Sequence, residues 1–280
     1  MHIKGLGTAS RPRLHVNSRP LTLTDGSTIH IDVQSAAFAE HSLVLAGAPA
    51  YRWAPGAGMH SAPSDDAGII GVVSGPTGTA SLLHSPVKGK IQTVRVASAG
   101  SLGWHFLFVQ TDQDRPTNGL YDSAAVWYGR FDGSRWHDVA KLFAATNSSL
   151  AATLSSDLVA DKIGIAFAFA FDNSAATQST PGRGQGVVLV HGTPRAWSSD
   201  TLFGQFRPTY VRLTRGATRE AWDVAFVEPY FDQNRRLRAS SVFVANFDRH
   251  WSQPRLIAAA GGRSGLDGLE VVRDPRGGHL

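Results

Sequence analysis

The stretch that decides the fold is residues 240–257, which read SSVFVANFDRHWSQPRLI. This segment predicts an apolar strand, a tight polar turn and a second strand that begins at Trp251. Two earlier segments repeat the pattern: residues 125–136, AVWYGRFDGSRW, and residues 187–197, VVLVHGTPRAW. A pattern that recurs in this way indicates an architecture built from repeated units.

Four such units follow one another, and each predicts four strands, A to D. The predicted strands are 29–33, 41–46, 69–73 and 80–84; 93–97, 104–109, 125–131 and 136–143; 154–160, 163–171, 186–191 and 197–203; and 209–214, 222–227, 241–247 and 251–257. The D strands align at Ala80, Trp136, Trp197 and Trp251, with spacings of 56, 61 and 54 residues. This pattern predicts an all-β fold, a β-propeller with four-stranded antiparallel blades over about 27–87, 91–143, 149–203 and 207–257.

The two ends of the chain leave the number of blades open. Residues 266–280 predict the first strand and turn of a partial fifth blade, in a propeller domain that covers 27–280. Residues 1–26 are polar, although Leu14 to Leu23 could supply a closing edge strand. The sequence therefore allows a five-bladed propeller closed by its N-terminal segment, or a fragment of a larger six- or seven-bladed propeller.

Composition limits the compartment and the chemistry. The chain has 280 residues, and no run approaches the roughly 18 apolar residues of a membrane span, which predicts a soluble protein without a membrane partner. No secretory signal is visible, so the location stays open, extracellular or periplasmic if the protein acts on glycans. The chain lacks cysteine, and its eleven histidines show no metal-binding spacing, so we expect no metal and no cofactor.

The net charge of +5 is carried by arginine, since the 27 basic residues are 22 Arg and 5 Lys. They are scattered, and Arg235–Arg238 is the one tight cluster, so the stripe typical of a nucleic-acid surface is missing. Arginine grips carboxylates with two parallel hydrogen bonds, which favours an anionic glycan such as a uronic or sialic acid as the partner. A GC-rich genome that prefers arginine codons would explain the same enrichment. The oligomeric state stays open.

Long loops between strands B and C mark the face on which we expect function. These connections cover 47–68, 110–124, 172–185 and 228–239, whereas the C to D turns are short. Trp53 or Tyr51 could stack on a sugar ring while Arg52 reaches a carboxylate. The predicted substrate-binding residues on this face are Tyr51, Arg52, Trp53, Arg115, Arg207 and Tyr210.

Two of the C to D turns carry a family resemblance. Residues 130–136, RFDGSRW, and 246–251, NFDRHW, resemble degenerate forms of the Asp-box turn of sialidase-like propellers. Residues 271–278, VVRDPRGG, resemble the innermost strand and turn of such blades. The resemblance implies hydrolysis of sialosides by a Tyr and Glu nucleophile pair, an Asp acid and arginines on the substrate carboxylate. On this sequence the catalytic candidates are Glu228, Tyr230 and Asp232, and Phe206-Arg207-Pro208 faintly matches the family's Arg-Ile-Pro motif.

Two other functions fit the same residues. A non-catalytic propeller that recognises a glycan or a protein would explain why the motifs that sialidases need are missing. A uronate polysaccharide lyase would need a Tyr or His base and an Arg, for which Tyr51, His60 and Arg52 could serve. A sialidase-like glycoside hydrolase is our first hypothesis, with these two as alternatives.

Overall fold

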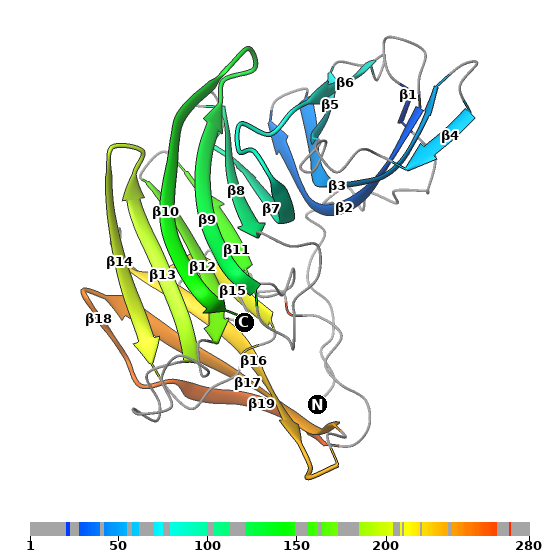
Figure 1. Cartoon of the computed structure of the whole chain (residues 1–280). Coiled ribbons are helices and arrows are strands. Elements are labelled where there is room, and N and C mark those ends of the chain that lie inside the picture. Colours follow the sequence, from blue (N-terminus) through cyan, green and yellow to red (C-terminus); the bar gives the residue numbers. More distant parts are fainter. Residues whose placement is uncertain are drawn as a thin grey trace, which may run out of the picture.

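The computed structural model is built from antiparallel β-sheets (Figure 1). It describes residues 21–22, 28–39, 42–54, 58–61, 70–74, 79–99, 103–111, 121–148, 156–161, 164–172, 185–203, 208, 210–218, 220–234, 237–261 and 269. Within these ranges every regular element is a strand, and four sheets follow one another along the chain. No helix long and apolar enough to cross a membrane is found among the described residues.

The second, third and fourth sheets are up-and-down meanders that follow the predicted units. Their strands are β7 (Lys90–Ser98), β8 (Trp104–Thr111), β9 (Tyr121–Phe131) and β10 (Trp136–Ser148); β11 (Ser156–Ala160), β12 (Ile165–Asp172), β13 (Gln185–Thr193) and β14 (Ala196–Phe203); and β15 (Tyr210–Arg215), β16 (Trp222–Phe231), β17 (Leu237–Asp248), β18 (His250–Trp251) and β19 (Arg255–Gly261). In the fourth sheet β18 and β19 both pair with β17. The fourth D strand was predicted to end at residue 257, whereas β19 continues along β17 to Gly261 as an outer strand.

The first sheet has the predicted four strands and two additions. Its strands are β1 (Leu21–Thr22), β2 (Thr28–Ala39), β3 (Ser42–Ala54), β4 (Gly58–Ser61), β5 (Ile70–Ser74) and β6 (Thr79–Leu83). β1 pairs with β2, and β4 pairs with the second half of β3. The 47–68 connection was expected to be irregular, and this expectation was wrong for 47–54 and 58–61, which continue the sheet.

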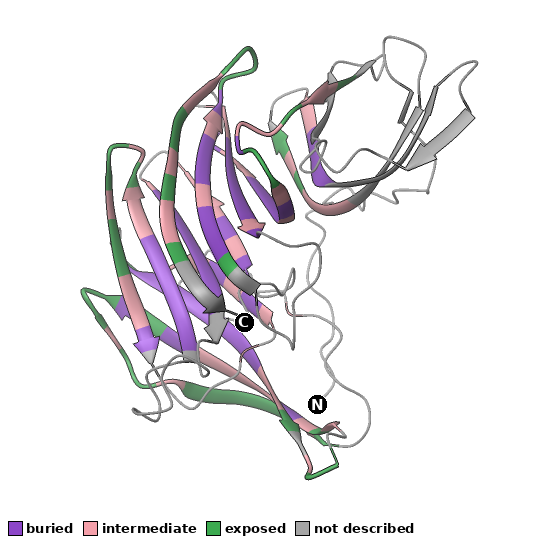
Figure 2. Ribbon diagram, viewed as in Figure 1, coloured by how far each residue is buried: buried purple, intermediate pink, exposed green. Residues whose placement is uncertain are grey.

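Consecutive sheets stack face to face, which makes them propeller blades. In β8, Phe106 and Phe108 belong to the core with the first sheet, whereas Leu107 belongs to the core with the third. All three side chains are fully buried, so β8 is apolar on both faces because a blade lies on each side. Figure 2 shows buried residues along the middle strands and exposed ones along β10, β14 and β19. The predicted all-β propeller architecture is confirmed, and the described sheets do not close into a ring.

The tryptophans that open the D strands pack between blades. Trp136 lies edge-on to Phe106, with ring centroids 5.0 Å apart, and its Nε1 donates to the carbonyl of His84 in the first sheet at 3.0 Å. Trp197 packs on Phe167 of its own sheet, at 5.8 Å between centroids, and on Tyr128 of the second sheet, at 4.9 Å. These residues were recognisable in the sequence because the same core position recurs in each blade.

Polar side chains join the innermost strands, β2, β7, β11 and β15. Gln34 of β2 accepts from the amide of Val94 at 2.9 Å, and Asp157 of β11 accepts from the amide of Leu213 at 2.9 Å. Between them, the Arg95 guanidinium donates to the carbonyl of Ser156 at 3.0 Å and to that of Gln34 at 2.9 Å. Arg95 thus links three blades through one side chain.

Burial shifts the pKa of both charged members of this inner cluster. It lowers the pKa of Arg95 to about 10, a shift that Asp157 opposes and the Arg212 charge reinforces. Burial raises the pKa of Asp157. The hydrogen bonds from the Leu213 and Leu158 amides and the charges of Arg212 and Arg95 lower it, but burial has the larger effect. Because Asp157 accepts amide hydrogen bonds on both oxygens, its carboxylate serves to hold strands together.

Removing the Arg95 side chain tests this link. We expect Arg95→Met to lower the free energy of unfolding by about 3 kcal/mol, because two carbonyl oxygens between blades lose their donors. Arg130→Met is the matched control: its ion pair with Asp138 is on the surface and contributes at most about 1 kcal/mol. Urea unfolding of both variants measures the difference, and equal losses would contradict the role given to Arg95.

A buried histidine predicts acid sensitivity. The His105 Nδ1 and the Tyr128 hydroxyl are 2.7 Å apart, and burial lowers the pKa of His105 to about 4 while raising that of Tyr128. The unfolded chain takes up a proton near the ordinary histidine pKa of about 6.5, so stability is full above that pH and falls toward pH 4 by about 3 kcal/mol.

The measurement is urea unfolding between pH 7 and pH 4. The double variant His105→Phe with Tyr128→Phe should show a shallower fall, because it has no buried histidine to protonate and leaves no hydroxyl without its partner. Tyr128→Phe alone keeps His105 buried and should keep the steep fall. A double variant that is as acid-sensitive as the parent would exclude His105 as the cause.

Candidate functional site

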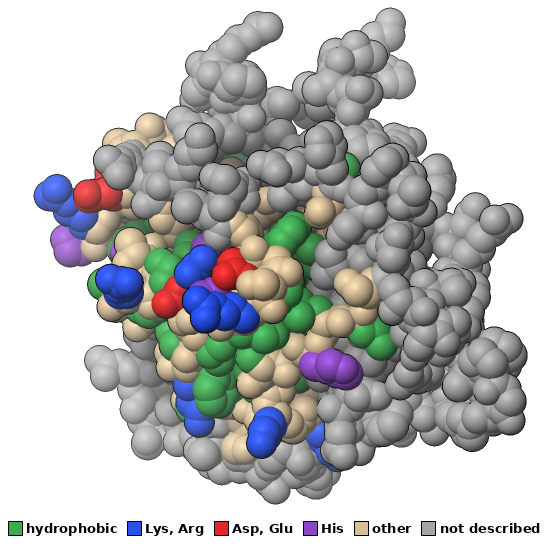
Figure 3. All heavy atoms as spheres, turned by 90° about the horizontal axis from the view of Figure 1, so that it is seen from above, with side chains coloured by type: hydrophobic (Ala, Val, Ile, Leu, Met, Phe, Trp, Pro, Cys, Tyr) green, Lys and Arg blue, Asp and Glu red, His purple; other side chains and the backbone are tan. Residues whose placement is uncertain are grey.

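A cavity of about 510 Å³ lies between the third and fourth sheets, at the end of the blades where the short turns are. We call it the turn-end cavity. Residues from both sheets line it: Gly164, His191, Gly192, Thr193, Ser198, Asp200, Arg215, Glu220, Trp222, Phe247 and Arg249. Figure 3 looks down on the turn end of the molecule and shows side chains of both charges gathered there beside hydrophobic ones.

Arg215 forms the floor of the turn-end cavity and joins the two sheets. Its Nε and Nη2 donate to the two carboxylate oxygens of Asp161 at 3.1 and 2.7 Å, and its guanidinium lies 3.7 Å above the ring of Trp222. Trp222 is almost completely buried. A planar guanidinium can make the paired hydrogen bonds and the stacking contact together, so the arginine is fixed in place.

One wall comes from the β13–β14 hairpin. His191 is directly opposite Ser198 in the register, and its Nε2 is 3.2 Å from a carboxylate oxygen of Asp200. The imidazole also packs on Phe247 of the fourth sheet, with centroids 5.1 Å apart. Ser198, Asp200 and His191 share one face of the hairpin, so a hydroxyl, a carboxylate and an imidazole line the same wall.

The opposite wall comes from two turns of the fourth sheet. Glu220 is in the β15–β16 turn, which is closed by the hydrogen bond from the Gly216 amide to the Ala221 carbonyl at 2.8 Å. Arg249 is in the β17–β18 turn with a left-handed φ of 64°. Both side chains line the cavity, and neither is in an ion pair among the described residues.

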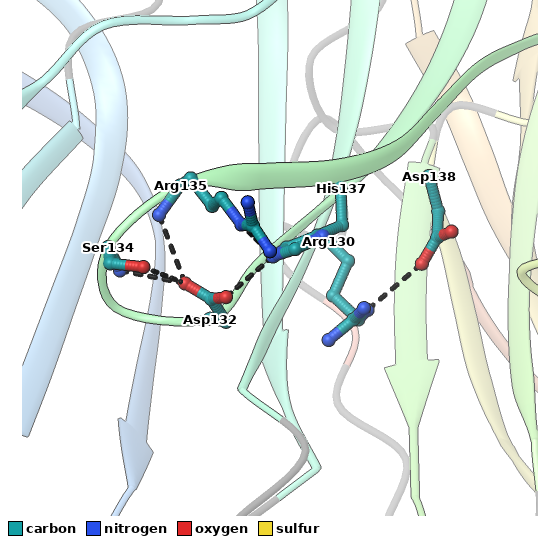
Figure 4. A network of polar contacts seen from close by, with 6 residues as sticks. All are labelled: Arg130, Asp132, Ser134, Arg135, His137 and Asp138. Carbon is teal, nitrogen blue, oxygen red and sulfur yellow. Dashed lines mark hydrogen bonds and ion pairs between the residues drawn. The ribbon is translucent and has the colours of Figure 1, made fainter.

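The turn that resembles an Asp box is built as a structural element (Figure 4). Asp132 accepts from the Ser134 amide and hydroxyl at 2.8 and 2.7 Å and from the Arg135 amide at 3.0 Å. Its other oxygen is 2.5 Å from His137 Nε2. The hydrogen bonds from the Arg135 amide, Ser134 and His137 hold the pKa of Asp132 well below its usual range. Both oxygens of this carboxylate thus stabilise the turn.

The three predicted catalytic residues lie at the far end of the fourth sheet. β16 continues through Pro229, so Glu228 and Tyr230 lie on one face of the strand. Glu228 is partly buried and Tyr230 is 64% exposed. Asp232 follows the strand and accepts from the Asn234 amide at 2.9 Å and from Arg238 Nη2 at 2.7 Å, so its charge is already paired.

Of the six predicted substrate-binding residues, Tyr210 is the one whose side chain the structure describes. Tyr210 opens β15 opposite Val227, on the other face of the sheet from Glu228. Tyr51, Arg52 and Trp53 are in β3, paired with β4, and their side chains are outside the described part, as are Arg115 and Arg207 entirely. Their roles remain predictions.

The residues that line the turn-end cavity were not predicted as site residues. Short turns were interpreted as structural elements, and function was expected on the long loops between strands B and C. Arg215 and Asp161 are 54 positions apart, and nothing local pairs them. The available signal was a charged residue in or beside several short turns, such as Glu220 before Trp222 and Arg249 before Trp251. In the described residues no group of three or more metal-ligating side chains is arranged to hold an ion.

Comparison with known proteins gives distant structural similarity. No protein-family model and no curated protein matches the sequence. A mutant of B. megaterium levansucrase aligns at 5% identity and a TM-score of 0.45, over 83% of this chain and 70% of the levansucrase. An α-L-arabinofuranosidase from Fusarium graminearum gives 11% and 0.48, over 82% and 69%. The Aleuria aurantia lectin in complex with Fucα1-6GlcNAc gives 9% and 0.43, over 86% and 67%.

Proposed function

We propose that the chain is a carbohydrate-binding propeller and that the turn-end cavity holds a sugar. The observation that carries the proposal is a cavity of about 510 Å³ whose polar walls come from two rigid sheets. That volume is in the range of about 300 to 1,000 Å³ that small-ligand sites occupy. The ion pair with Asp161 holds Arg215 in place before a ligand arrives, and the contact of Nε2 with Asp200 holds the His191 imidazole, which lowers the entropy cost of binding.

The lining suits a polyhydroxyl ligand. Each sugar hydroxyl both donates and accepts, and the walls offer carboxylates that accept, a guanidinium that donates and hydroxyls that do both. Asp200, Glu220 and Arg249 supply the charged groups, and Thr193 and Ser198 the hydroxyls. The face of Trp222 is covered by Arg215, so hydrogen bonds rather than ring stacking would hold the sugar.

An acidic sugar is the ligand that we favour. The Arg249 guanidinium lines the cavity without an ion pair in the described part of the chain, and it could receive a ligand carboxylate in bidentate fashion. The resemblance of the Asp132 turn to the turns of sialidase-like propellers supports the choice of sialic or uronic acids.

Direct binding measurements test this function. In calorimetric titrations with sialic acid, glucuronic acid and galactose, we expect the acids to bind and Arg249→Gln to weaken them about tenfold or more, since a charge-assisted pair contributes about 1.5 to 3 kcal/mol. Arg195→Gln, which removes an exposed arginine of the neighbouring β13–β14 turn, is the matched control and should bind like the parent. No binding of any of the three sugars at millimolar concentration would refute the proposal.

Hydrolysis of sialosides is a second candidate function, favoured by the course of β16 through Pro229. This course leaves Glu228 and Tyr230 on one face, as a Tyr nucleophile assisted by a Glu would require. The ion pair between Asp232 and Arg238 argues against Asp232 as the acid of this reaction. A uronate lyase would use other residues, Tyr51, His60 and Arg52, and is distinguished by its unsaturated product.

Turnover on a panel of sialosides and uronans separates these functions. If the hydrolase is correct, Glu228→Gln and Tyr230→Phe each lower the rate of sialoside cleavage by about 100-fold or more, because each removes a group that acts in the transition state. Asp138→Asn, an exposed carboxylate of the second sheet, is the control and should cleave normally. Glycan binding without turnover in the parent would exclude catalysis and leave the binding function standing.

A further inference from the structure

The outermost strand of the fourth sheet, β19, is exposed along almost its whole length (Figure 2). Leu256 and Ile257 are 54% and 49% exposed, and Ala260 is the one residue of the strand that is partly buried. A Cβ atom added to Gly261 would have no other atom within 4 Å. Because neighbouring side chains of a strand point to opposite faces, exposure at consecutive positions leaves both faces of β19 open.

The outer edge of β19 has no strand partner in the described part of the chain. Its inner edge pairs with β17, and no other described strand pairs with it. Ile257 is an extra residue in this register, whereas the pairing runs without interruption from Ala258 to Gly261. An edge with a regular run of backbone donors and acceptors is a template on which another strand can pair.

The side chains of β19 do not protect this edge. Natural edge strands are shielded by charged residues, by proline or by a covering segment. The outer strand β10 carries Asp138 and Lys141, and the outer strand β14 carries Asp200. In β19 the one charged residue is Arg255, at the first position, and residues 256–261 are all apolar. The outer edge of the fourth sheet is therefore open where those of the second and third sheets carry charge.

A second copy of β19 fits this edge in an antiparallel register centred on Ala259. In this register the two Ala259 residues are opposite each other, Ala258 is opposite Ala260, and Ile257 is opposite Gly261. The large side chain thus meets the position beside which there is open space. The two Arg255 residues are then roughly 27 Å apart along the paired strands, well beyond the Debye length of about 8 Å, so they do not repel each other appreciably.

The same composition argues against a partner of unlike sequence. Residues 256–261 offer no charge and no hydrogen-bonding side chain by which such a partner could be selected. The match of Ile257 with Gly261, in contrast, is a property that the strand has with itself. Self-complementarity of this kind is what a twofold symmetric interface requires.

From these observations we infer that two copies of the chain associate through β19 and form one continuous antiparallel sheet across a twofold axis at Ala259. Backbone hydrogen bonds join the two strands, and Leu256 and Ile257 lose exposed apolar surface. Because the paired segment is short, we expect a dimer that dissociates in the micromolar range. The inference goes beyond the proposed sugar-binding function and does not rest on it.

Disulfide cross-linking tests the register, because the chain has no cysteine of its own. Ala259→Cys places a thiol opposite its copy, at a Cα separation of about 4.5 to 5.5 Å that a disulfide can span. We expect oxidation of this variant to give a covalent dimer as the main product on non-reducing electrophoresis. Ala144→Cys, which changes an exposed alanine of the outer strand β10, is the matched control and should stay mainly monomeric. Equal cross-linking of the two variants would overturn the inference.

Sedimentation velocity tests the association without a cross-link. Between about 1 and 200 µM, we expect the mass of the parent to rise from 29.9 kDa toward twice that value. Ile257→Lys adds a charge inside the paired segment and should remain monomeric, whereas Val139→Lys, at an exposed valine of β10, should dimerise like the parent. Circular dichroism establishes that each variant is folded. A parent that is monomeric throughout, or a dimer that Ile257→Lys leaves intact, would overturn the inference.

Discussion

The Arg95 guanidinium is the interaction on which the arrangement of the blades most depends. Apart from the two residues of β2 that pair with β1, each innermost strand has one edge that no described strand of its own sheet covers, so the backbone groups along that edge need other partners. Arg95 reaches carbonyls of β2 and β11 from β7, and Gln34 and Asp157 reach amides of the next inner strand. Side chains thus replace the missing strand pairing. The neutral Gln34 and the charged Asp157 do the same work, which indicates that geometry rather than charge is required.

The strand pattern in the sequence predicted the blades because the middle strands are buried on both faces. The run Phe106-Leu107-Phe108 is apolar at every position, with no alternation of polar and apolar residues. Turns followed by a Trp separate such runs along the sequence. Stacking a blade on each side of such a strand satisfies both faces. The extra strand β4 and the last four residues of β19, 258–261, were missed, since β4 has no apolar signal and the alanines of β19 resemble a linker. Both pair through backbone groups that every sequence offers.

The candidate site was harder to predict than the fold because its contacts join distant segments. Glu228 and Tyr230 could be placed on one strand face from their spacing alone. Arg215 and Asp161 meet only because the third and fourth sheets stack, and the left-handed backbone at Arg249 cannot be inferred from a residue type that rarely adopts it. The Asp132 turn shows the opposite case: a local motif whose hydrogen bonds follow from four consecutive residues and His137.

The turn end combines two properties that a binding site needs. Short turns fix the backbone, and the seam between two blades leaves a space because side chains from two sheets cannot interlock at their ends as they do in the core. At this seam Arg215 is stacked on Trp222 and paired with Asp161, which removes its freedom, while Glu220 and Arg249 lie beside it without ion pairs in the described residues. A site with rigidly held groups beside charges without ion pairs is one in which ordering a ligand costs little. The same feature that separates neighbouring blades at their ends therefore supplies a preformed recess for a ligand.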